Sequence, residues 1–80
     1  MVAVMPTENL TSDADTLGRR IRTARSRAGL YQRELAEALG ISVHYLCRVE
    51  RDHVKPSTVL VGKIARRVDV SVDELLGSAA

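Results

Sequence analysis

Apolar side chains recur along this chain at intervals of three and four residues, and nowhere do they alternate over a length that would make a strand. Spacing of this kind places the apolar groups on one face of an α-helix. The clearest case lies at 32–39, where Leu35, Ala36 and Leu39 share a face. The pattern therefore predicts an all-α protein.

The same periodicity marks four other segments. We expect helices from about 15 to 28, from 43 to 50, from 57 or 58 to 68, and a last one after residue 71. The positions expected to face the core are Leu17, Ile21, Ala24, Ala28, Leu46, Val49, Val61, Ile64, Ala65 and Val68. The prediction is a five-helix domain with one small aliphatic core.

The junction between the second and third predicted helices has the residues of a tight turn. Gly40 stands where the first of these helices must end, and a residue without a Cβ adopts positive φ there at no steric cost. Ser42 has the chemistry of an N-cap, and Ile41 and Leu46 occupy the two positions of a hydrophobic staple. This arrangement is typical of a helix-turn-helix, whose second helix is presented to the DNA major groove.

Composition limits the size and stability of the fold. The chain has 80 residues, of which 45% are hydrophobic, and it contains neither Trp nor Phe. The core must therefore come from Leu, Ile, Val and Ala. Because a chain of this length buries only about 60–65% of its unfolded surface, we expect a thin stability margin without a partner subunit.

Charge divides the chain into two parts. Residues 1–16 hold Glu8, Asp13 and Asp15 with no Lys or Arg, so the net +2 of the whole chain leaves +5 for the remainder. We expect residues 1–14 to be a flexible acidic arm and residues 15–80 to form the domain. A compact basic body fits a polyanionic partner. The arginines of the first helix expected to be solvated are Arg19, Arg20, Arg22 and Arg27.

Several function classes are disfavoured by what the chain lacks. A single cysteine, Cys47, cannot form an intramolecular disulfide, and no apolar run has the length of a membrane span or the form of a signal peptide. We therefore expect a cytoplasmic protein with no membrane partner. His44, Cys47 and His53 are too sparse for a metal site. Without an acid that converges on them, a Gly-rich phosphate loop or a metal-ligand spacing, the sequence does not favour an enzyme.

From about Leu17 to Gly77 the chain resembles the phage lambda repressor/Cro type of helix-turn-helix domain, the XRE-like regulators. The resemblance depends on an ordered set of residues at characteristic spacings, because no single one of them is specific. The matching residues are Gly29, Leu30, Gln32, Leu35, Ala36, Gly40, Ser42, Arg48, Val49, Glu50, Pro56 and the closing segment 70–76, Val-Ser-Val-Asp-Glu-Leu-Leu. The resemblance implies a lambda-repressor-like all-α fold that binds double-stranded operator DNA.

The resemblance also implies which side chains meet DNA. Val43, His44 and Arg48 correspond to base-contacting positions of the third helix, and a guanidinium can hydrogen-bond O6 and N7 of one guanine. An alternative for Arg48 is an ion pair with a nearby acid such as Asp52. The residues implied to contact phosphates are Gln32, Arg33, Tyr45, Arg51 and Lys55. For Tyr45, packing on the second helix is an alternative to a phosphate contact.

A structural ion pair follows from the same resemblance. In relatives an arginine late in the first helix pairs with the glutamate that ends the third helix, which corresponds here to Arg25 and Glu50. A half-buried carboxylate needs such a partner. We therefore expect Glu50 to orient the third helix.

The sequence departs from the family pattern at three helix ends. Tyr31 stands where relatives have Ser or Thr, so the side-chain cap of the second helix should be lost. Asp52 and Asp69 stand where Gly is usual, and Asp tolerates the left-handed conformation better than most residues. At the last helix, Ser71 and Glu74 have the spacing of a capping box.

The fourth helix has apolar residues at positions that are usually polar. Val59 and Leu60 are neighbours there, and exposed apolar neighbours on a small domain indicate a partner surface. We expect these two residues to contribute to a two-fold homodimer. Such a dimer would bind a near-palindromic operator through successive major grooves.

Two functions follow from these observations. The first is a sequence-specific DNA-binding transcriptional regulator, most simply a repressor, acting as a homodimer. The alternative is an antitoxin or protein-binding adaptor that uses the same fold to bind a toxin or another regulator. Neither function requires a cofactor or a catalytic residue.

Overall fold

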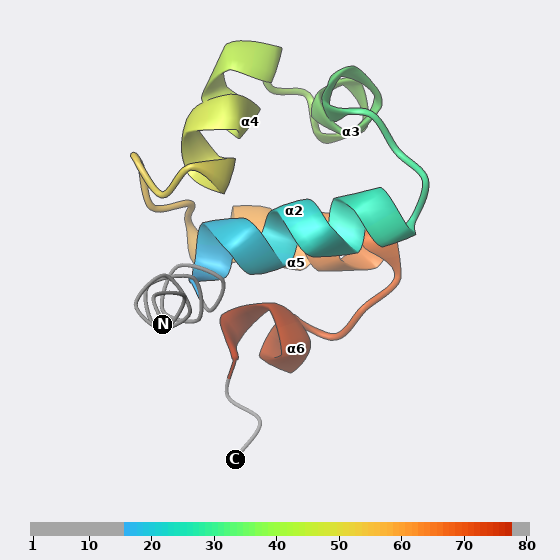
Figure 1. Cartoon of the computed structure of the whole chain (residues 1–80), viewed down its shortest axis with the longest axis vertical. Helices are drawn as coiled ribbons and strands as arrows, with labels where there is room; N and C mark the ends of the chain where they lie inside the picture. The colour runs from blue at the N-terminus through green and yellow to red at the C-terminus, as the bar shows by residue number, and fades with distance from the viewer. Residues whose placement is uncertain (1–15, 78–80) are drawn as a thin grey trace, which may run out of the picture.

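The computed structural model describes residues 16–77, and these form an all-helical body (Figure 1). Five helices lie in this range: α2 (Leu17–Arg27), α3 (Gln32–Leu39), α4 (Val43–Glu50), α5 (Thr58–Val68) and α6 (Val72–Leu76). The predicted fold class is therefore confirmed. The arm expected at 1–14, and Asp15, lie outside the described residues.

The helices are arranged around a central pair. α2 and α5 are packed against each other, α3 and α4 lie on one side of this pair, and α6 lies on the other (Figure 1). No helix among residues 16–77 is long and apolar enough to cross a membrane.

Aliphatic side chains from all five helices meet in one core. The largest fully buried ones are Ile21, Leu35, Leu46, Val49, Ile64 and Leu75. Ala24, Val61, Ala65 and Val68 are buried as expected, whereas Ala28 is exposed because α2 ends at Arg27 and Ala28 is only its C-cap. The helical spacing therefore identified the core, but the first helix is shorter than the spacing suggested.

Leu60 corrects our expectation of two exposed apolar neighbours on α5. Val59 is 70% exposed, but Leu60 is partly buried and packs against the core. Leu60 lies four residues before Ile64 and eight before Val68, so it belongs to the same inward stripe. Only Val59 of this pair is a large exposed apolar side chain.

Hydroxyl side chains begin four of the five helices. Ser42, Ser57, Ser71 and Thr16 each accept a hydrogen bond from a backbone N–H of the first turn. At α3 the phenol of Tyr31 makes no such bond, as predicted; instead the Tyr31 N–H donates to Oε1 of Glu34 at 2.8 Å. The reciprocal half of a capping box thus partly replaces the missing hydroxyl.

Asp52 adopts the left-handed conformation predicted for it and also joins two parts of the fold. Its φ is 63°, and that of Asp69 is 61°. One carboxylate oxygen of Asp52 accepts from Thr16 Oγ1 at 2.6 Å, and the other accepts from the Gly18 N–H at 2.9 Å. The residue after α4 therefore binds the first turn of α2, a contact that glycine could not make.

Gly18 is required by the close approach of α2 to the end of α4. A Cβ at this position would lie 2.6 Å from the carbonyl oxygens of both Val49 and Glu50. Those oxygens belong to backbone and cannot rotate away. The low helix propensity of Gly18 is thus offset by contact between two helices.

Arg20 corrects the expectation that it is solvated. Its Nε donates to the Leu75 carbonyl at 2.6 Å and its Nη2 to the Leu76 carbonyl at 3.1 Å. These carbonyls end α6, where a cation is favoured by the helix dipole. Arg20 therefore attaches the last helix to α2.

We predict that Gly18→Ala destabilises the protein by about 1–3 kcal/mol, because its methyl group overlaps two backbone carbonyls. Gly62→Ala, in the middle of α5, is the matched control. A Cβ there has no heavy atom within 4 Å, so the change should stabilise the protein by up to about 1 kcal/mol through helix propensity. Urea unfolding of both variants measures the two effects, and equal midpoints would contradict the steric explanation.

Candidate nucleic-acid interface

The turn between α3 and α4 has a backbone geometry that fixes the angle between the two helices. Gly40 is left-handed with φ of 73°, and the Ile41 N–H donates to the Ala36 carbonyl at 3.0 Å. This bond is the long one of a Schellman C-cap. The Ser42 hydroxyl then accepts from the Tyr45 N–H at 3.0 Å and begins α4. The structure thus contains the helix-turn-helix that the sequence predicted.

α4 has one buried face and one open face. Leu46 and Val49 are fully buried, and Tyr45 is half-buried with its side chain packed against the core. On the other face Val43 is 41% exposed, and His44 and Arg48 are exposed. The three side chains predicted to contact bases therefore share the open part of this helix.

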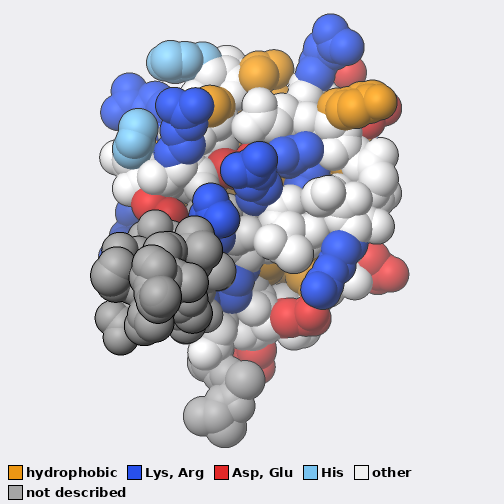
Figure 2. Space-filling model, in the orientation of Figure 1, with side chains coloured by type: hydrophobic (Ala, Val, Ile, Leu, Met, Phe, Trp, Pro, Cys, Tyr) orange, Lys and Arg blue, Asp and Glu red, His pale blue; other side chains and the backbone are white. Residues whose placement is uncertain are grey.

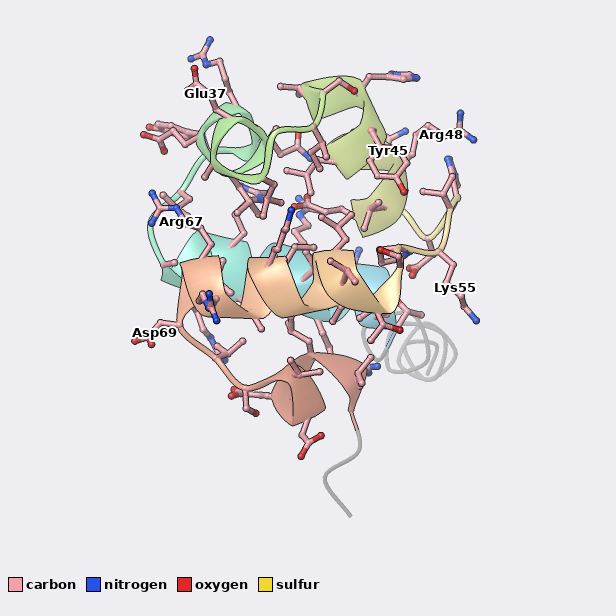
Figure 3. The ribbon with its side chains drawn as sticks, turned by 180° about the vertical axis from the view of Figure 1, so that it is seen from behind. Glu37, Tyr45, Arg48, Lys55, Arg67 and Asp69 are labelled. Carbon is pink, nitrogen blue, oxygen red and sulfur yellow. The ribbon has the colours of Figure 1, made fainter. Side chains whose placement is uncertain are left out.

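The cations predicted to contact phosphates come from α3, from the end of α4 and from the loop that follows it. Arg33, Arg51 and Lys55 are exposed, and neither they nor Arg48 form an ion pair with any described residue. Figure 3 shows Arg48 and Lys55 on the same side of the molecule, one from α4 and one from the loop that follows it, both directed away from the helices. Asp52 bonds to α2 instead, so the alternative ion pair for Arg48 is not formed.

Glu50 is the centre of a buried polar network that links three helices. Its side chain is 3% exposed, and its two oxygens accept from Nε and Nη2 of Arg25 at 2.7 and 3.1 Å. Arg25 also donates from Nη1 to the Leu30 carbonyl at 2.8 Å. The structure therefore brings together the two residues of the expected pair, in a bidentate geometry that satisfies both oxygens.

Gln32, for which the resemblance implies a phosphate contact and a bracing role for the third predicted helix, is a member of this network. Its Nε2 donates to Oε1 of Glu50 at 2.9 Å. Gln32 is the first residue of α3, so the bond ties the start of α3 to the end of α4. The spacing of residues along each helix carries no signal for such a contact between helices.

Arg22 was not among the predicted site residues, but it lies beside the helix-turn-helix. It lines an open hollow of about 390 Å³ together with Tyr31, Gln32, Cys47 and Arg51, with Arg25 and Glu50 also contributing. Figure 2 shows Lys and Arg side chains gathered over α2 and α4 on this face of the molecule. The basic surface thus extends from α4 onto α2. The position of Arg22 in α2 could have indicated that its side chain is exposed. It could not have indicated that Arg22 shares a hollow with residues of α3 and α4.

Cys47 is half-buried in the wall of this hollow. Among residues 16–77 no group of three or more His, Cys, Asp or Glu side chains could hold a metal ion.

A helix-turn-helix whose second helix has an open polar face, held by a buried pair to the first helix of a five-helix body, defines the lambda-repressor-like class of domains. Comparison with known proteins agrees. The family model described as a helix-turn-helix domain matches residues 16–76, and this chain belongs to that family.

Two relatives carry names that describe transcriptional regulators. The HTH-type transcriptional regulator ImmR of Bacillus subtilis (strain 168) is 42% identical over 62 residues, covering 78% of this chain and 49% of ImmR. The uncharacterized HTH-type transcriptional regulator YazB of the same strain is 41% identical over 63 residues, covering 79% of this chain and 91% of YazB. This chain thus matches about half the length of ImmR but nearly all of YazB.

Solved structures with the same fold include DNA complexes. The biofilm master regulator SinR in complex with DNA has a TM-score of 0.70 at 36% identity, covering 75% of this chain and 97% of that one. The P22 c2 repressor with a synthetic operator has a TM-score of 0.72 at 26% identity, covering 78% and 94%. A SinR/SinI protein complex has a TM-score of 0.71 at 37% identity, covering 76% and 60%. These neighbours are regulators rather than enzymes.

We predict that Arg25→Ala destabilises the protein by about 3–5 kcal/mol, because it leaves the buried Glu50 carboxylate without its cation. Arg22→Ala removes the same charge from the exposed surface of α2 and should change stability by less than about 0.5 kcal/mol. Thermal and urea unfolding at one ionic strength compare the two variants. If Arg25→Ala melts like Arg22→Ala, the pair has no structural role.

Proposed function

We propose that this chain is a sequence-specific DNA-binding transcriptional regulator, acting as a repressor, that inserts α4 into the major groove. The observation that carries the proposal is the open face of α4, whose exposed side chains have no partner among the described residues. SinR and the P22 c2 repressor, which share the fold, are both described in complex with DNA.

In this proposal the start of α4 reads the bases. Val43 and His44 are in the first turn of the helix, which approaches base edges most closely in a helix-turn-helix. The Val43 methyl groups suit a thymine methyl, and His44 can donate to a guanine. Arg48 lies one turn further on and can hydrogen-bond two acceptors of one guanine.

The surrounding cations position the helix without reading sequence. Arg33, Arg51 and Lys55 are exposed and supply cations for phosphates. Gln32 keeps one amide hydrogen and its oxygen beyond the bond to Glu50, so it can contact a phosphate while bracing α4. The Tyr45 ring packs on the core, which leaves only its hydroxyl for such a contact. Binding should weaken steeply with salt, because each neutralised phosphate releases counterions.

The regulator would bind its operator as a homodimer. Val59 on α5 and Leu76 on α6 are exposed apolar side chains, and Leu60, next to Val59 in α5, is partly buried against the core. A two-fold axis through this surface would place two α4 helices about 34 Å apart, in successive major grooves.

A protein partner is a second candidate function, supported by the SinR/SinI complex among the structural neighbours. A toxin or another regulator bound to α5 and α6 would leave α4 available. Stable co-purification of a second protein with the natural chain would favour this function, and it is compatible with DNA binding.

We predict that Arg48→Ala loses preference at one definable base pair, with a cost of about 1–3 kcal/mol there. Selection of binding sites from random duplex DNA, with the native chain and the variant, measures this change. Equal preference at every position would exclude Arg48 from base reading.

Lys55→Ala should lower affinity similarly for all duplexes and reduce the salt slope by about 1. Arg67→Ala is the matched control, because Arg67 lies at the far end of α5 from Arg48 and Lys55 (Figure 3). Titrations at several salt concentrations compare the two variants. The same slope for both would show that only net charge, and no phosphate contact, is involved.

Val59→Lys should shift the chain from dimer to monomer and lower operator affinity, because it places a charge in an apolar contact. Ala38→Lys, at an exposed position of α3, is the control, because it adds the same single positive charge. Sedimentation with and without DNA measures the oligomeric state. If the native chain is monomeric at high concentration in both conditions, the dimer is wrong.

A further inference from the structure

Three exposed arginines form a row beside the helix-turn-helix. Only one of them, Arg51, is among the proposed DNA contacts. We define the arginine strip as Arg19 and Arg22 on α2 with Arg51 after α4. Arg22 and Arg51 line the same hollow, and Arg19 and Arg22 line the next one along α2, of about 320 Å³. None of the three forms an ion pair with a described residue. The strip is therefore a row of exposed cations without an ion-pair partner among residues 16–77, although the Asp52 carboxylate lies near one end of it, bonded to Thr16 and Gly18.

The acidic segment 1–15 joins the body at the end of this strip. Its last residue is bonded to Thr16, which begins α2 and is held to Asp52 by a 2.6 Å hydrogen bond. Arg19 and Arg22 lie three and six residues further on, about 5 and 9 Å along the helix axis. The attachment point is thus fixed next to the strip and next to the end of α4.

Length and charge both fit this surface. Asp13 can lie up to about 10 Å from Thr16, and Glu8 up to about 26 Å, in an extended chain. Together with Asp15 they give the segment three carboxylates and no Lys or Arg. Tethering keeps these carboxylates at a high effective concentration around the strip.

We propose that the acidic segment 1–15 docks on the arginine strip and competes there with DNA phosphates, so that the chain lowers its own affinity for non-operator DNA. Its carboxylates take the place of phosphate oxygens at Arg19, Arg22 and Arg51. Docking lowers the affinity for every duplex by the same factor, but an operator, whose base contacts to α4 add affinity, still displaces the segment at concentrations where a duplex bound through phosphates alone does not. The docking itself concerns only this chain, and the competition rests on the proposed function.

The first test measures docking without DNA. Arginine Nε–H resonances of Arg19 and Arg22 are compared by NMR between the native chain and a variant with Glu8→Gln and Asp13→Asn. The matched control carries Asp73→Asn and Glu74→Gln on α6, which lies on the other side of the α2–α5 pair (Figure 1). We expect shifts in the first variant and none in the control. Unchanged resonances in both would overturn the docking.

The second test measures competition on a duplex of arbitrary sequence at low salt. Neutralising Glu8 and Asp13 should raise affinity about three- to tenfold, whereas the α6 control with the same charge change should raise it less than about twofold. In a background of Arg19→Gln and Arg22→Gln, which leaves only Arg51 of the strip, the gain from the first variant should be clearly smaller, and an undiminished gain in this double-mutant cycle would overturn the docking.

The outcomes separate this inference from the proposed function. An equal gain in the α6 control would overturn the inference, because the effect would then be one of net charge. Normal operator binding with no NMR shift would also overturn it, leaving the strip as a surface for phosphates alone. If no duplex binds at any salt concentration, the proposed DNA-binding function fails, and the NMR comparison still decides whether the segment docks.

Discussion

The burial of one carboxylate constrains the whole helix-turn-helix. Moving a charged group out of water costs several kcal/mol, so Glu50 can be 3% exposed only if its partners are held in place. Arg25 of α2 supplies a bidentate pair and Gln32 of α3 supplies a third donor. Because Glu50 is the last residue of α4, any shift of α4 against α2 or α3 would break one of these bonds. The ion pair therefore defines an orientation more than it adds stability.

A second contact fixes the same end of α4 from another direction. The carbonyl oxygens of Val49 and Glu50 lie so close to Gly18 that no side chain fits between, and Asp52 accepts from the first turn of α2. The C-terminal end of α4 is thus anchored, while its first turn, with Val43 and His44, is open. A reading surface on a rigid element loses less entropy when it binds.

Helical spacing and cap residues were sufficient to predict the five helices, the turn at Gly40 and most of the core. They failed where a contact joins segments far apart in the sequence. The roles of Gly18, Arg20 and Asp52 depend on residues 31 or more positions away, and nothing in the local pattern indicates such partners. Leu60 was misassigned because two adjacent apolar residues on a helix point in different directions, and only one can follow the inward stripe. The resemblance to known regulators supplied the Arg25–Glu50 pair, which periodicity alone could not.

The arginines of α2 illustrate how one residue type serves two purposes on a single helix. Arg20 and Arg25 donate to carbonyl and carboxylate groups of the protein, so their charge is used in holding α6 and α4. Arg19 and Arg22 are exposed and have no ion-pair partner among residues 16–77. Exposed charges contribute little to folding, since water and salt screen them, yet they attract a polyanion over a Debye length. Stability and attraction to an anionic partner therefore reside in different arginines, although all four lie within six positions of one another in the sequence. An anion that neutralises Arg19 and Arg22, whether it is a bound ligand or a tethered acidic segment, would therefore leave the contacts of Arg20 and Arg25 intact and would not disturb α2.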